Sequence, residues 1–155
     1  MWKLRYNLFQ KILEIITVVI LVASIVYVAI RYSQIPVKIP THFDLVGNPD
    51  GWGKKSSIFL IVGANVFLYI FMSICTFFPK MWNLPVKITE ENQNRIYSYA
   101  LDMLLVMKFI IVVSFTYMTV CSMEGMPLGI WFTIIMLGAV FGSLIFYIIK
   151  MVRNR

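Results

Sequence analysis

Four long apolar blocks constrain this chain more than any other feature of its sequence. They span residues 12–30, 57–78, 99–121 and 129–149. Each has about 20 residues, the length that an α-helix needs to cross roughly 30 Å of hydrocarbon. The blocks are apolar on all sides rather than along one stripe, so each is expected to face lipid or another span. Because a helix satisfies its backbone hydrogen bonds internally, the sequence predicts four transmembrane helices.

The composition excludes the soluble and the disordered classes of protein. Apolar residues make up 60% of the chain and charged residues 14%, against about 45–50% and about 25% in ordinary soluble domains. The aromatic share of 15% is far above that of a disordered chain. At 155 residues, we expect one all-α integral membrane domain over residues 1–155, a four-helix transmembrane bundle.

Basic residues predict the direction of the spans. The chain has 14 Lys and Arg residues against 7 Asp and Glu. Nine of the basic residues lie before the first span, in the loop 79–98 or after the fourth span, and four lie in the loop 31–56. Lys and Arg accumulate on the cytoplasmic side of membrane proteins. Both termini are therefore expected in the cytoplasm and the loop 31–56 outside.

The placement of these basic residues also indicates their partner. The basic clusters are short and adjoin the spans, so we expect them to contact anionic lipid headgroups rather than nucleic acid. Tryptophan side chains prefer the interface between membrane and water. All four tryptophans fall near a predicted interface: Trp2, Trp52, Trp82 and Trp131.

The outer loop 31–56 is long for a simple connection, and long loops are often functional. The alternation from Thr41 to Leu45 is typical of a short strand that places His42 and Asp44 on one face. The tetrapeptide Asn48–Gly51 (NPDG) predicts a turn, because proline pre-sets its own φ and glycine tolerates a positive one. Such a turn is expected to bring Asp50 toward His42.

Two pieces of this loop resemble a known family. Ile39–Asp44 (IPTHFD) and Gly47–Lys54 (GNPDGWGK) are similar to the signature of bacterial membrane proteins that carry the domain of unknown function 1648. The segment Asn83–Asn92 (NLPVKITEEN) is similar to short members of the family. The resemblance covers the end of the first span, the loop and the start of the second span. It implies the bacterial cytoplasmic (inner) membrane and this fold, but no chemistry.

The family includes SdpI-like proteins, relatives of a sporulation-delay immunity protein that protects cells against a toxic peptide. Those immunity proteins have additional spans. A role of this chain in immunity or signalling is therefore one expectation among several.

The polar residues of the loop allow three interpretations. They could satisfy the loop's own backbone, as Asp and Asn often do in turns. They could bind an external peptide or ligand, or His42, Asp44 and Asp50 could hold a metal ion. The candidate ligand-binding residues are His42, Asp44, Asn48, Asp50, Gly51 and Trp52.

Catalytic motifs are absent from the sequence. It contains no His-Glu-x-x-His motif, no phosphate-binding loop and no Gly-x-Ser-x-Gly motif. We therefore expect neither an enzyme nor a bound cofactor.

Polar residues within the spans form a second candidate site. Lys108 lies inside the third span, where a charge costs at least about 2.5 kcal/mol. Asp102 lies six residues earlier, about 120° around the helix, and is not expected to pair with it. Asn65 in the second span or Glu14 in the first could receive a hydrogen bond from Lys108. Two explanations fit these residues: they line a pathway for a substrate or a proton, or they make a single structural contact between helices.

The fourth span contains a Gly-x-x-x-Gly spacing formed by Gly138 and Gly142. Small residues at this interval let two helices approach closely. The spacing is compatible with an intramolecular helix contact, with a homodimer, or with no contact at all.

These observations predict a non-enzymatic membrane protein that binds or senses a ligand, a peptide or another protein at its outer loop. The alternatives are a small transport or permeation module that uses Lys108 and Asn65, and a metal-dependent membrane enzyme.

Overall fold

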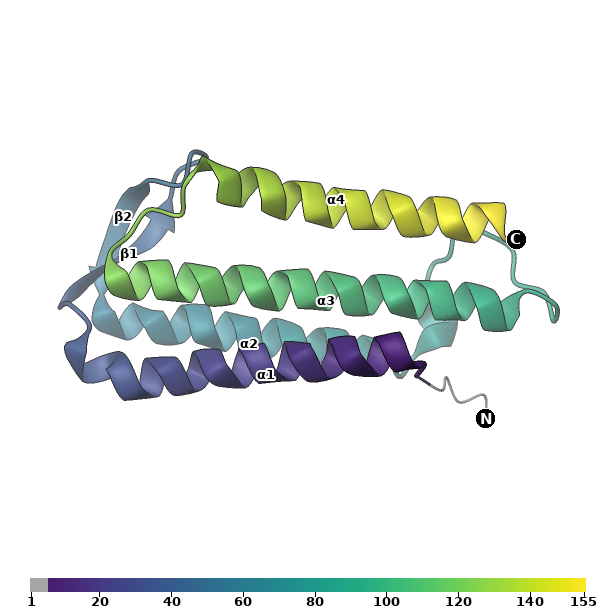
Figure 1. The fold of residues 1–155 in the computed structure, drawn as a ribbon, viewed down its shortest axis with the longest axis horizontal. Coiled ribbons are helices and arrows are strands. Elements are labelled where there is room, and N and C mark those ends of the chain that lie inside the picture. Colours follow the sequence, from purple (N-terminus) through teal and green to yellow (C-terminus); the bar gives the residue numbers. More distant parts are fainter. Residues whose placement is uncertain (1–5) are drawn as a thin grey trace.

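The computed structural model describes residues 6–155. Trp2, Lys3 and Arg5, which entered the arguments on interfaces and charge, lie outside the described residues. Four helices run side by side, and two strands cap one end of them (Figure 1). The elements are α1 (Leu8–Arg31), β1 (Lys38–Phe43), β2 (Pro49–Lys54), α2 (Ile58–Cys75), α3 (Gln93–Glu124) and α4 (Ile130–Arg153).

We call the end that carries the strands the hairpin end and the opposite one the terminal end. α1 begins and α4 ends at the terminal end (Figure 1). All four helices are long and apolar enough to cross a membrane, and each predicted span overlaps one of them.

The helix ends differ from the predicted span limits for local reasons. α1 begins at Leu8 rather than residue 12, because Asn7 Oδ1 accepts a hydrogen bond from the Gln10 backbone N–H, and Gln10 Oε1 accepts one from Asn7 N–H. This reciprocal capping box satisfies two backbone donors. α2 ends at Cys75 rather than at residue 78. The Cys75 carbonyl, at this helix end, accepts a hydrogen bond from the Trp82 indole N–H at 2.9 Å.

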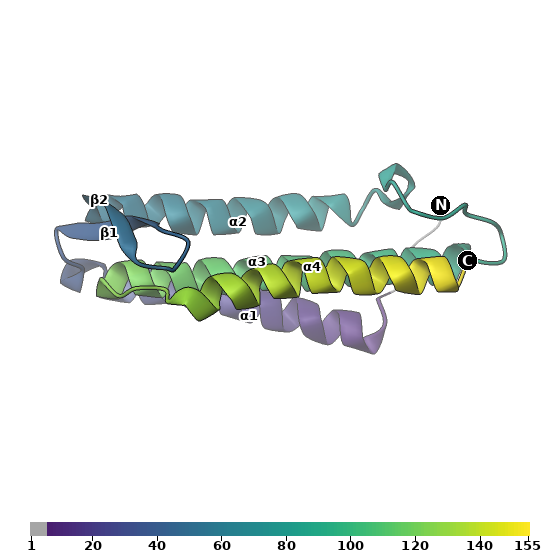
Figure 2. The same cartoon turned by 90° about the horizontal axis from the view of Figure 1, so that it is seen from above.

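The core lies around α3. This helix contacts α1, α2 and α4, whereas α1 and α2 touch each other over a much shorter stretch. Seen from above, α1 and α2 lie on opposite sides of the α3–α4 pair (Figure 2). Twelve residues of α3 are buried, against two of α4. The bundle is thus a central helix with three helices around it, and α4 presents most of its apolar surface outward.

The hairpin is fastened to the helices by a small apolar core. Its buried members are Val28, Ile35, Ile39, Ile58 and Met123. They come from α1, the strand region, α2 and α3, so the hairpin is seated on three helices rather than suspended from a flexible loop. Ile39 of β1 is 1% exposed, and burial of such a side chain contributes about 1.5–3 kcal/mol.

The turn of the hairpin lies earlier than the sequence predicted. β1 overlaps the expected strand, but Pro49, Asp50 and Gly51 belong to the extended strand β2. The chain reverses between Asp44 and Asn48 instead, because Asp44 Oδ1 accepts backbone hydrogen bonds from Val46 (3.0 Å) and Asn48 (2.8 Å). The side chain of Asp44 therefore organises the turn that Asn48–Gly51 was expected to make.

Gly47 completes this turn and locks it against the connection between α3 and α4. Its φ of +84° is one that side-chain-bearing residues rarely adopt. The Gly47 carbonyl accepts a hydrogen bond from Leu128 N–H at 2.8 Å. A Cβ at this position would lie only 2.6 Å from Gly129 N, so the close approach requires glycine.

The intramolecular contact, one of the three possibilities for the Gly-x-x-x-Gly spacing, is not made within residues 6–155. Gly138 and Gly142 are exposed, and a Cβ added at either would meet no atom within 4 Å among the described residues. α4 contacts α3 through other residues, among them Ser143, whose hydroxyl donates to Met107 Sδ at 3.3 Å. The small-residue face of α4 therefore points away from the bundle.

Candidate functional site

The exposed face of the hairpin brings His42 and Asp50 together. Residues of β2 alternate between partial burial and exposure, and Asp50 and Trp52 are on the exposed side. Nδ1 of His42 lies 2.5 Å from Asp50 Oδ1, and since a carboxylate only accepts, the imidazole N–H donates. The two side chains are 73% and 45% exposed, so the pair is available to a ligand.

Glycine at position 51 makes this geometry possible. Gly51 pairs with His42 across the hairpin, and a Cβ on Gly51 would lie 2.8 Å from His42 Cβ. Trp52, the next residue, is 58% exposed. The three residues define a small polar and aromatic surface on a backbone held by the strand pairing.

The other predicted loop residues have structural roles. Asp44 is occupied by two backbone N–H groups of its turn, and Asn48 supplies a backbone N–H and carbonyl to that turn. The metal hypothesis required His42, Asp44 and Asp50 to converge. Over residues 6–155, no three His, Cys, Asp or Glu side chains are grouped closely enough to hold an ion, so this three-residue set does not form.

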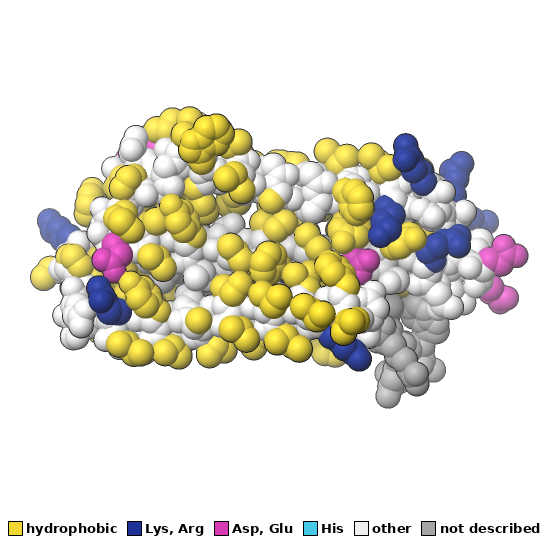
Figure 3. Space-filling model, in the orientation of Figure 1, with side chains coloured by type: hydrophobic (Ala, Val, Ile, Leu, Met, Phe, Trp, Pro, Cys, Tyr) yellow, Lys and Arg dark blue, Asp and Glu magenta, His cyan; other side chains and the backbone are white. Residues whose placement is uncertain are grey.

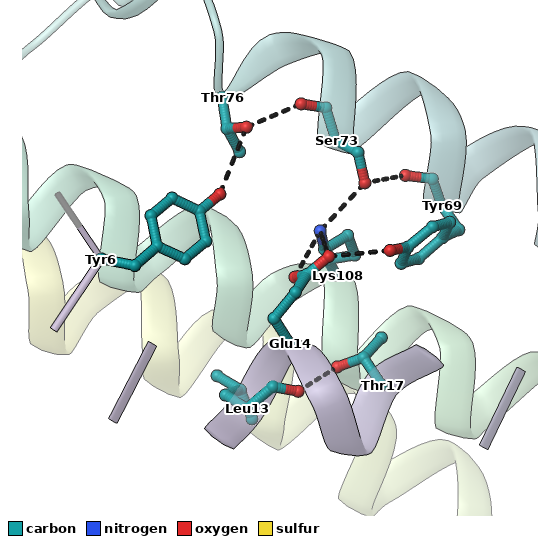
Figure 4. A network of polar contacts seen from close by, with 8 residues as sticks. All are labelled: Tyr6, Leu13, Glu14, Thr17, Tyr69, Ser73, Thr76 and Lys108. Carbon is teal, nitrogen blue, oxygen red and sulfur yellow. Dashed lines mark hydrogen bonds and ion pairs between the residues drawn. The ribbon is translucent and has the colours of Figure 1, made fainter. Parts of the chain in front are cut away.

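An ion pair between a buried lysine and a partly buried glutamate joins α1 and α3. Lys108 Nζ lies 2.8 Å from Glu14 Oε1 and 2.7 Å from Glu14 Oε2, and the Lys108 residue is 1% exposed. α2 completes the site: Tyr69 O–H donates to Glu14 Oε1 at 2.8 Å and Lys108 donates to Ser73 Oγ at 3.0 Å. Figure 4 shows these side chains converging from three helices.

This arrangement neutralises the lysine charge within the protein. The ammonium also lies 4.7 Å from the centre of the Tyr69 ring, a cation–π contact that adds to the ion pair. From Ser73 the polar contacts continue toward the terminal end, because Thr76 Oγ1 donates to the Ser73 carbonyl and Tyr6 O–H donates to Thr76 Oγ1 at 3.4 Å. The site is a partly buried polar cluster between α1, α2 and α3.

The partners of the intramembrane residues are decided by this packing. Of the two partners proposed for Lys108, Glu14 is correct and Asn65 is wrong. The Asn65 amide donates to the Val112 carbonyl at 3.4 Å. Asp102 is not paired with Lys108, as predicted, and it accepts a hydrogen bond from Gln10 Nε2 at 2.6 Å.

Sequence reasoning missed Gln10, Tyr69 and Ser73. A signal for one of them was present: Gln10, Glu14, Thr17 and Ser24 recur at intervals of three, four and seven residues in α1, which is one helical face. Gln10, Thr17 and Ser24 are buried. A polar stripe on an otherwise apolar span indicates the face that packs against other helices. Tyr69 and Ser73 show no comparable pattern.

Four apolar helices with a polar interior contact define a multi-pass helical membrane protein. Residues 19–66 match the family model described as Domain of unknown function (DUF1648), the family that the loop motifs resemble. No curated protein and no solved structure matches the chain. The matched segment begins within α1 and ends within α2, and thus contains the whole hairpin.

Proposed function

We propose that this chain is a non-enzymatic protein of the bacterial cytoplasmic membrane that binds a peptide or protein partner outside the cell through its hairpin. The observation that carries the proposal is the exposed His42–Asp50 pair beside Trp52 on a firmly seated hairpin. An exposed aromatic side chain on a rigid backbone is typical of residues that dominate protein interfaces. An imidazole and a carboxylate beside it add directional hydrogen bonds.

The orientation of the hairpin is part of the proposal. Lys and Arg side chains gather at the terminal end of the molecule (Figure 3). By the rule that cytoplasmic segments are rich in Lys and Arg, the terminal end is cytoplasmic and the hairpin faces outward. The described basic residues near the terminal end are Lys11, Lys80, Lys87, Arg95, Lys150, Arg153 and Arg155.

Site-specific photo-crosslinking in living cells tests this proposal. A photoreactive amino acid in place of Trp52 should give a discrete cross-linked product, and H42A/D50A in the same chain should abolish it. The matched control places the photoreactive residue at Ile135 of α4, which is 65% exposed and expected to face lipid. A Trp52 product that is absent, or that persists in H42A/D50A, would refute binding through this surface.

Transport is the second candidate function, and it is favoured by the line of polar contacts from the Glu14–Lys108 pair to Tyr6. Intramembrane ion pairs often mark ion or proton pathways. Proteoliposomes of wild-type protein and of E14Q/K108M discriminate the two candidates. Proton or potassium flux that the double variant abolishes would support transport. Equal, background flux for both proteins would reject it.

A further inference from the structure

We infer that the terminal ends of α3 and α4 form a discrete binding site for one anionic phospholipid. A cavity of about 380 Å³ lies along the last turns of α4, and its surface is mainly apolar with basic side chains at one end. Phe146 and Ile149 form the apolar part, and Lys150, Arg153 and Asn154 form the polar part. The inference concerns the end opposite the hairpin and does not depend on the proposed partner.

The order of these residues along α4 matches the order of groups in a phospholipid. Phe146, Ile149, Lys150 and Arg153 follow at helical intervals of three and four residues and therefore share a face. The apolar members come first, on the side of the hydrocarbon, and the cations follow in the last turn of a helix long enough to span the membrane. An acyl chain would lie along Phe146 and Ile149, with the phosphate at Lys150 and Arg153.

The three cations around the end of α4 form no direct ion pair among the described residues, and the acidic neighbour of Lys150 is the carboxylate of Asp102. Within residues 6–155, no carboxylate oxygen lies within 4.0 Å of the charged groups of Lys150, Arg153 or Arg95. The nearby carboxylate of Asp102 is 7% exposed and already hydrogen-bonded by Gln10. Arg153 and Lys150 thus carry positive charge that no protein carboxylate contacts directly, which is complementary to an anionic headgroup, and clusters of Lys and Arg at the ends of transmembrane helices attract such groups.

The geometry holds two of these cations in place before a lipid binds. Lys150 Nζ lies 4.4 Å from the centre of the Tyr99 ring of α3, which fixes the ammonium beside the cavity. Arg95 of α3 donates from Nε to the Asn154 carbonyl at 3.0 Å. This contact places a third cation beside the end of α4. A preorganised site loses less conformational entropy on binding than loose surface lysines do.

Native mass spectrometry of the purified full chain tests the inference. With equal amounts of phosphatidylglycerol and phosphatidylcholine of the same acyl chains, we expect one retained phosphatidylglycerol and roughly tenfold weaker retention of phosphatidylcholine. K150Q/R153Q should abolish this preference. K80Q/K87Q removes the same charge from the same end of the molecule and should retain it.

Each other outcome counts against the site. Equal retention of the two lipids would refute it, and equal losses in K150Q/R153Q and K80Q/K87Q would show diffuse attraction instead of a site. Displacement of phosphatidylglycerol by millimolar inorganic phosphate would show that an anion alone is recognised. If K150Q/R153Q does not fold, R153Q alone provides the test, because Arg153 is exposed. It should lower the retention of phosphatidylglycerol severalfold, and unchanged retention would overturn the inference.

Discussion

The ammonium of Lys108 lies within 2.8 Å of both carboxylate oxygens of Glu14, a residue 94 positions earlier in the chain. Breaking a buried pair leaves one uncompensated charge, whereas replacing both members can be nearly neutral. We expect K108M to lower the free energy of unfolding by about 3 kcal/mol, and E14Q/K108M to lower it by about 1 kcal/mol. Thermal unfolding in detergent measures both. If the double variant is as unstable as K108M, the pair has a role other than mutual neutralisation.

The contact between Gly47 and Gly129 gives a prediction about the hairpin. G47A should cost roughly 2 kcal/mol or more, because it combines an unfavourable φ with a backbone clash. G125A is the matched control: Gly125 has a φ of +66° but no neighbouring atom within 4 Å, so only about 1 kcal/mol is expected. Unfolding curves and the rate of proteolysis within the hairpin measure the difference. Equal effects would contradict the close approach.

The His42–Asp50 pair should contribute little to folding. Exposed ion pairs contribute about 1 kcal/mol or less, and both side chains are well exposed. H42A and D50A are therefore expected to leave the unfolding midpoint nearly unchanged, and any loss of cross-linking in these variants then reports on binding. A large loss of stability in either variant would instead assign the pair a structural role.

The proposed topology can be checked by cysteine labelling. In a background with Cys75 and Cys121 replaced by serine, L45C should react with a membrane-impermeant maleimide in intact cells, since Leu45 is 86% exposed at the hairpin end. K87C, in the connection between α2 and α3, should react only after the cells are permeabilised. The reverse pattern would invert the orientation.

The outward-facing glycines of α4 make a further prediction. Because a Cβ added at Gly138 or Gly142 would meet no other part of the described chain within 4 Å, G138L should leave the free energy of unfolding of the monomer within about 0.5 kcal/mol of wild type. The mass of the particle in detergent, measured by light scattering, tests the homodimer left open by the sequence. If the wild-type protein is a dimer and G138L is a monomer, this face of α4 mediates self-association. If the wild-type protein is a monomer, this face contacts lipid.

The sequence by itself determined the four helices and their membrane character. A segment that crosses hydrocarbon must be long, apolar and hydrogen-bonded within itself. Because each segment meets this requirement on its own, residues 12–30 and residues 129–149 could each be predicted as a span from their own sequence. The loop motifs likewise indicated the family whose model, DUF1648, matches residues 19–66. The contact between His42 and Asp50 could also be predicted, because the two residues are only eight positions apart and the chain reverses its direction between them.

Tertiary structure alone decided which polar groups pair and which element is central. Glu14, Tyr69 and Lys108 come from three helices, and only their packing selects Glu14 over Asn65 as the partner of the lysine. The turn moved to Asp44 because its side chain and Gly47 satisfy contacts that include Leu128, more than 80 residues away. A periodic stripe such as that of α1 can show which face packs, but it does not name the partner on another helix, so the pairing is set when the helices assemble around α3.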